Sequence, residues 1–118
     1  MKITLGSEGN TLKSKVAKRF GHAQYYVIYD TETETLEVIE NIDDNHTHSV
    51  LYELLDKGTE VFIVGNIGPH AYNIVKTGSV KVFLARNKTL YEAINAYKNG
   101  ELKELTEPTV KKSIGHTH

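Results

Sequence analysis

Four of the six histidines fall in predicted loops, and imidazole is the side chain of this sequence best suited to bind a transition metal. They are His22, His46, His48 and His70. His46 and His48 can converge on one ion only if their backbone is extended or looped. The alternatives are a solvent-exposed helix start for this pair and a structural role for His22. We take His22, His46 and His48 as candidate metal ligands and His70 as a neighbouring site residue.

The sequence contains no cysteine, which excludes disulfides, thiolate catalysis and cysteine-bound zinc or iron–sulfur sites. Any metal must therefore be held by histidine, carboxylate or backbone groups, or must arrive with its own sulfide. His116 and His118 form a second pair near the end of the chain. This pair either binds a divalent metal weakly or has no fixed role.

A basic run and a glycine-containing turn are candidates for anion binding. The basic residues are Lys13, Lys15, Lys18 and Arg19. The turn at residues 65–69 precedes a predicted helix, and Gly65 and Gly68 would let backbone N–H groups approach an anion. The alternatives are a solvated basic face and a tight strand-to-helix turn. The turn is neither a P-loop nor a dinucleotide fingerprint, because the lysine and the spacing are missing.

Five strands and three helices are predicted to position these residues. Apolar and β-branched patterns predict strands at residues 3–5, 25–30, 36–40, 61–64 and 80–83. The strand at 36–40 should have one wet face, because Leu36 and Val38 flank Glu37. Amphipathic spacing and turn residues predict helices at 47–57, from 69 to near 78, and from 89 to near 99. Thr89 and Glu92 form a capping box at the start of the last helix.

A hairpin followed by β-α-β patterning predicts an α/β fold with a mixed sheet of order 3-2-1-4-5 and an antiparallel second strand. Five connections then meet at one edge of the sheet, where ligands of open α/β sheets bind. They are residues 6–10, 19–24, 41–48, 65–70 and 85–88. The predicted core consists of Phe20, Ile28, Leu51, Leu54, Ile63, Val64, Val82 and Ile94.

The length of 118 residues fits one domain, which we place at residues 1–105 with a polar flexible tail over 106–118. A net charge of −1 provides no overall positive potential that would attract nucleic acid or acidic lipid. The sequence shows neither a signal-like start nor an apolar run of membrane length, so we expect a cytoplasmic protein. Enzyme motifs are absent, and the first strand offers no carboxylate for a two-metal nuclease, so we predict that the chain is not an enzyme.

Several segments match one family in order and spacing. Phe20-Gly21-His22-Ala23, followed by a strand, resembles the Phe-Gly-Arg-Ala signature of the dinitrogenase iron–molybdenum cofactor biosynthesis family. Residues 61–69 resemble its Val-Ile-x-Gly-x-Ile-Gly-Pro turn, and 78–83 its Gly-Ile-x-Val strand. Residues 99–102 resemble its Gly-Glu-Leu close, and Asn41 with His46 and His48 is similar to its His-bearing connector.

This resemblance implies a ribonuclease H-like, three-layer fold and a non-enzymatic role in binding or carrying iron–molybdenum cofactor or iron–sulfur cluster precursors. It implies a metal cluster and cluster-assembly proteins as partners, and we expect a monomer or weak dimer without nucleic-acid or membrane partners. Arg19 stands where some nitrogenase-linked members carry His, and His22 where the family often has Arg. Ligation has therefore moved to His22 or been lost. The alternative function is a small-molecule or anion-binding regulatory domain unrelated to nitrogenase.

Overall fold

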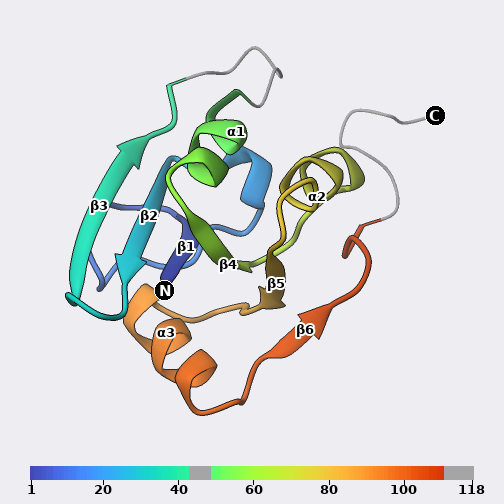
Figure 1. The fold of residues 1–118 in the computed structure, drawn as a ribbon. Helices are drawn as coiled ribbons and strands as arrows, with labels where there is room; N and C mark the ends of the chain where they lie inside the picture. The colour runs from blue at the N-terminus through green and yellow to red at the C-terminus, as the bar shows by residue number, and fades with distance from the viewer. Residues whose placement is uncertain (43–48, 111–118) are drawn as a thin grey trace.

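The computed structural model describes residues 1–42 and 49–110. Within them lies a sheet of order β3-β2-β1-β4-β5-β6, with β3 and β6 at its two ends (Figure 1). β1, β4 and β5 are parallel, whereas each of the other strands is antiparallel to the neighbour that precedes it in the chain. The strands are β1 (Lys2–Ser7), β2 (Tyr25–Asp30), β3 (Thr35–Glu40), β4 (Thr59–Val64), β5 (Lys81–Leu84) and β6 (Lys103–Leu105).

The predicted order of the first five strands and the antiparallel second strand are confirmed, but the prediction of only five strands is wrong. β6 adds to the outer side of β5, with Leu105 opposite Val82. β6 has three residues and only one of them, Leu105, is apolar and buried. Such a segment is too short to show a period-two pattern, and it becomes a strand because β5 offers an unpaired edge.

Helices cover both faces of the sheet and make three layers (Figure 1). Helices α1 (Ser49–Asp56) and α2 (Pro69–Val75) pack on one face, and α3 (Leu90–Lys98) packs on the other. The predicted capping box is confirmed: Glu92 N–H donates to the Thr89 hydroxyl, and Thr89 N–H donates to the Glu92 carboxylate. No helix in the described ranges is long and apolar enough to cross a membrane.

The two faces of the sheet have separate apolar cores, because successive side chains of a strand point to opposite sides. In β4, for example, Phe62 contributes to the core under α1 and α2, and Ile63 to the core under α3. All eight residues predicted to be buried are less than 5% exposed. A buried apolar core on each face of the sheet therefore stabilises the strand pairing that positions the site.

The prediction that the 36–40 strand buries one face is wrong. Leu36 and Val38 are each 39% exposed. They lie opposite Tyr29 and Val27, which point toward α3. The core under α3 includes residues of β1, β2 and β4 but none of β3. The alternation therefore identified the strand correctly, but no helix among the described residues covers the face that carries Leu36 and Val38, whereas Ile39 on the other face is partly buried against the core under α1 and α2.

Candidate functional site

The segment at residues 8–19, which we call the belt, lies across the carboxyl ends of the parallel strands. Ala17 N–H donates to the Gly6 carbonyl at 2.9 Å, which joins the belt to the end of β1. Val16 N–H donates to the Lys88 carbonyl at 2.9 Å. Asn66 N–H donates to the Lys18 carbonyl at 2.9 Å. Phe20 N–H also donates to the Asn66 carbonyl at 2.8 Å. These bonds confirm that the connections at 6–10, 19–24, 65–70 and 85–88 converge at one edge, while most of the predicted connection at 41–48 lies outside the described residues.

Gly65 allows the belt to pack on the end of β4. A Cβ atom at this position would overlap with the Ala17 carbonyl oxygen. The glycine thus accommodates the chain's own backbone rather than a ligand, as in the alternative interpretation of this turn. Gly68, in contrast, has an ordinary φ of −84°, and a Cβ atom there would make only normal contacts.

Two adjoining hollows lie beside the belt, with volumes of about 320 and 480 Å³. Lys15, Gly65, Asn66 and Arg86 line the smaller one. Arg19 and His22 line the larger one, together with Gln24. Both hollows share Glu8, Ala17 and Lys18. The surface contains four cationic side chains and one carboxylate, so its charge is positive.

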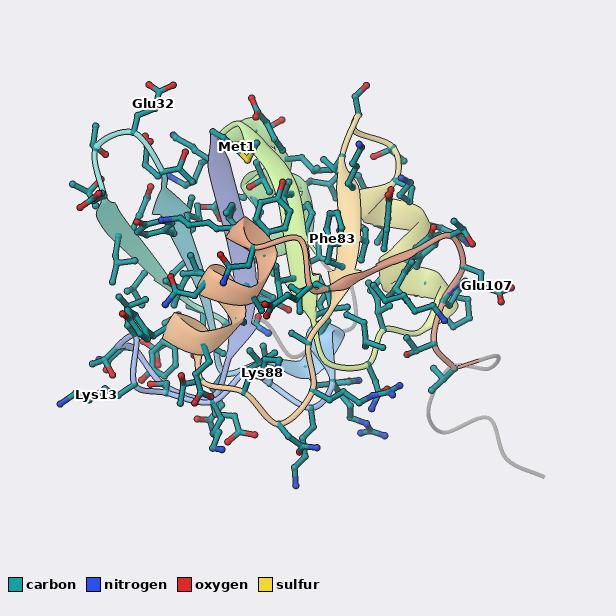
Figure 2. The ribbon with its side chains drawn as sticks, turned by 90° about the horizontal axis from the view of Figure 1, so that it is seen from below. Met1, Lys13, Glu32, Phe83, Lys88 and Glu107 are labelled. Atoms are coloured by element: carbon teal, nitrogen blue, oxygen red, sulfur yellow. The ribbon has the colours of Figure 1, made fainter. Side chains whose placement is uncertain are left out.

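Hydrogen bonds fix Arg86 within this surface. Its guanidinium donates to the Asn66 side-chain oxygen from Nε at 3.1 Å and from Nη2 at 2.7 Å. The following residue, Asn87, has a φ of 61°, a left-handed conformation that turns the chain back toward Lys88 and the belt. Arg86 therefore presents its charge from a defined position. Figure 2 shows Lys13 and Lys88 at this end of the molecule and Met1 and Glu32 at the opposite end.

The backbone N–H groups of the turn at 65–69 are largely used within the protein. Asn66 N–H is bound to Lys18, and Ile67 N–H donates to the Thr109 hydroxyl at 2.8 Å. Thr109 N–H in turn donates to the Ile67 carbonyl at 3.0 Å. The prediction that this turn offers donors to an anion is wrong for these two groups. Thr109, placed by sequence in the polar tail, covers the turn.

A short 3-10 turn, η1 (Phe20–His22), carries His22. The Tyr26 hydroxyl donates to the Phe20 carbonyl at 2.6 Å, and burial raises the pKa of this hydroxyl. The Phe20 ring packs edge-on against Tyr26 and Phe62, with ring centroids 5.2 and 5.5 Å apart. This buried anchor places the exposed side chain of His22 at the larger hollow.

The structure brings together three of the predicted site residues: Arg19, His22 and Gly65. Gly68 and His70 lie at the start of α2, outside the lining of the two hollows, and His70 is exposed. His46 and His48 lie outside the described residues. Within the described ranges, no three His, Asp or Glu side chains are grouped so that they could hold a metal ion.

The lining of the hollows includes Lys15, Lys18 and Arg86, for which the sequence contained a signal, and also Glu8 and Asn66, which sequence reasoning missed. The two lysines belong to the basic run, and Arg86 to a predicted converging loop, so both signals were present. Glu8 and Asn66 had no signal, because an isolated polar loop residue is ordinary. Their place depends on the belt crossing the sheet.

The fold and the site together define an α/β protein with a basic binding surface at the carboxyl ends of its parallel strands. The chain is a member of the dinitrogenase iron-molybdenum cofactor family, whose family model matches residues 1–100. An uncharacterized protein of Methanocaldococcus jannaschii is 30% identical over 111 residues, which cover 88% of this chain and 91% of that protein.

Solved structures show the same fold. A Thermotoga protein described as a NifB candidate of the DUF35 family is 40% identical, with a TM-score of 0.83 and coverage of 92% of this chain and 97% of that one. The apo form of the orange protein from Desulfovibrio gigas has a TM-score of 0.85 and covers 92% of this chain and 96% of its own. At 24% identity, this second likeness concerns the fold alone.

Proposed function

We propose that this protein is a non-catalytic binding or carrier protein, which holds iron–molybdenum cofactor or an anionic iron–sulfur precursor at the belt. The observation that carries the proposal is the grouping of Lys15, Lys18, Arg19 and Arg86 around two adjoining hollows. Family membership supports this choice of cargo. We expect its partners to be cluster-assembly proteins.

The charges of the site suit an anionic cargo. The lysines and arginines come from the belt and from the loop after β5, and only Glu8 opposes them within the lining. Lys15, Lys18, Arg19 and Arg86 are all exposed, so their attraction for an anion weakens with rising ionic strength. Such binding is reversible, as a carrier that must release its cargo requires.

The chain can supply little covalent ligation. It has no cysteine, so a bound cluster keeps its own sulfides. His22 is the one predicted imidazole ligand within the described ranges, and it lines the larger hollow. We propose that His22 contributes a single ligand while the cations supply most of the affinity. His46 and His48 remain predicted ligands. The ribonuclease H-like fold that the family resemblance implies also remains a prediction.

The alternative function is a regulatory domain that binds a small-molecule anion at the same cations. The basic lining accepts either ligand. The two proposals differ in the anion that binds tightly, so a titration with both kinds separates them.

The test is an anaerobic titration of isolated iron–molybdenum cofactor into the wild type, followed by visible absorption and co-elution on gel filtration. Replacement of both Lys15 and Lys18 by Gln should weaken binding at least about tenfold, since each lysine is a charge-assisted contact. The matched control replaces Lys81 and Lys103 by Gln, which removes the same charge from exposed positions on β5 and β6. His22→Ala should weaken binding less than the double lysine variant.

Equal affinity of the two double variants would contradict a site at the belt. Absence of binding by the wild type, together with saturable binding of inorganic phosphate in the same buffer, would favour the regulatory alternative.

A further inference from the structure

Strand β3 has backbone hydrogen-bonding groups that are directed away from the sheet. It is the last strand on its side. Asn41 N–H, just beyond β3, donates to the Gln24 carbonyl at 2.9 Å, so it points toward β2. Backbone groups alternate in direction along a strand. Leu36, Val38 and Glu40 therefore turn their N–H and C=O groups outward, where no strand among the described residues pairs with them.

Apart from its carboxylates, this edge lacks the features that usually prevent pairing with another chain. Edge strands are commonly protected by proline, lysine, a bulge or short length. β3 has six residues, no proline and no lysine, and its register with β2 is unbroken. Its Leu36 and Val38 side chains, each 39% exposed, offer apolar contacts on the α3 side. β6, at the opposite edge, has only three residues.

The charge around β3 is negative. Residues 25–56 include no lysine or arginine. The hairpin at 30–40 contains five carboxylates: Asp30, Glu32, Glu34, Glu37 and Glu40. Lys57 Nζ lies 2.9 Å from the Glu37 carboxylate, and the N-terminal ammonium lies 3.8 Å from that of Glu32. Within the described ranges, Glu34 and Glu40 form no ion pair.

This charge decides between two kinds of partner. Two copies joined edge to edge through β3 would bring two acidic hairpins together, and like charges opposite one another destabilise a sheet. A strand that carries lysine or arginine would instead meet unpaired carboxylates. The edge thus favours a basic partner over a second copy of this chain.

We propose that β3 is a docking strand for an extended, basic segment of a partner protein, which adds to the sheet beside it. The backbone of the segment pairs with Leu36, Val38 and Glu40. Its apolar side chains pack beside Leu36 and Val38, and a lysine or arginine lies beside Glu40. This mode is β-strand addition, in which backbone bonds give affinity and alternate side chains give specificity. The proposal does not depend on what binds at the belt.

The test uses the full chain labelled with ¹⁵N and the synthetic peptide acetyl-Thr-Lys-Val-Lys-Val-Lys-Thr-amide as the probe. The amide signals of Leu36, Val38 and Glu40 should shift saturably on titration. The same peptide with Glu in place of Lys should produce no such shift. Glu40→Lys should weaken peptide binding at least about fivefold, since it replaces an attraction by a repulsion. Glu104→Lys makes the same charge change on β6 at the other edge and should leave binding unchanged.

Three results would overturn the proposal. The first is absence of saturable shifts on β3 at millimolar peptide. The second is an equal response to the acidic peptide or equal weakening by Glu40→Lys and Glu104→Lys. The third is a change of the β3 signals with protein concentration alone, which would assign the edge to a second copy of the chain.

Discussion

The carbonyl oxygen of Ala17 packs directly against Gly65, so the belt approaches β4 more closely than any side chain at that position would allow. Gly65→Ala should therefore destabilise the fold by roughly 1–3 kcal/mol, the usual cost of overpacking. Urea denaturation followed by circular dichroism measures this loss. Gly65→Ala should also weaken cluster binding, because the added methyl group would displace the belt, which carries Lys15 and Lys18.

The control for this substitution is Gly68→Ser. Gly68 precedes α2, its φ of −84° suits any residue, and serine is a favourable N-cap. We expect no loss of stability. If Gly68→Ser cost as much as Gly65→Ala, close packing of the belt would not be the reason for glycine at position 65.

Tyr26→Phe should leave the buried Phe20 carbonyl without its shortest hydrogen bond and cost about 1–3 kcal/mol of unfolding free energy. Tyr72→Phe is the matched control, since it removes a hydroxyl from the same core whose bond to the Leu105 carbonyl is long, at 3.5 Å. The control should lose less, below about 1 kcal/mol. Equal losses in urea titrations of the two variants would argue against a special role of Tyr26 in anchoring η1.

The capping box should make part of the stability depend on pH. The backbone N–H of Thr89 donates to the Glu92 carboxylate and lowers its pKa below the ordinary value of 4.5. The folded state therefore favours the charged form, and this contribution is complete above pH 4.5 and is lost as the pH falls further. The stability difference between wild type and Glu92→Gln should shrink over that range.

Thermal unfolding from pH 7 to pH 3 measures this difference, with Glu101→Gln as a control outside the helix. A difference that stays constant with pH would contradict the role of the charge. Thr89→Ala should cost about 1 kcal/mol near neutral pH, as removal of an N-cap usually does.

The five longer strands and three helices were predictable, because each has a recognisable pattern of apolar residues and turn or capping residues at its ends. Thr89 and Glu92 identified the start of α3, and the apolar stretch that contains Phe62 and Ile63 identified β4 as a central strand. β6 was not predictable, since its pairing depends on the unpaired edge of β5. The exposure of Leu36 and Val38 was also missed, because alternation shows which face is apolar but not whether a helix extends over it.

The candidate site was predictable only in part. Strand directions placed Arg19 and His22 at the correct edge. The roles of Gly65 and Glu8 depend on long-range hydrogen bonds between the belt and strands distant in sequence, and local patterns do not carry that information. For the same reason, the sequence did not show that Thr109 covers the turn at 65–69, because this contact joins residues 42 positions apart.

The most direct test of the central claim is to locate the cargo by NMR. Isolated iron–molybdenum cofactor, added anaerobically to the ¹⁵N-labelled protein, should selectively broaden or shift the amide signals of Lys15, Lys18, Arg19, Asn66 and Arg86. The signals of β6 and of the 31–34 turn should remain unchanged and serve as internal references. Selective changes at the belt are the result that we predict. Saturable changes confined to other surfaces, or none while the cofactor stays intact, would contradict a cluster-binding site at the belt.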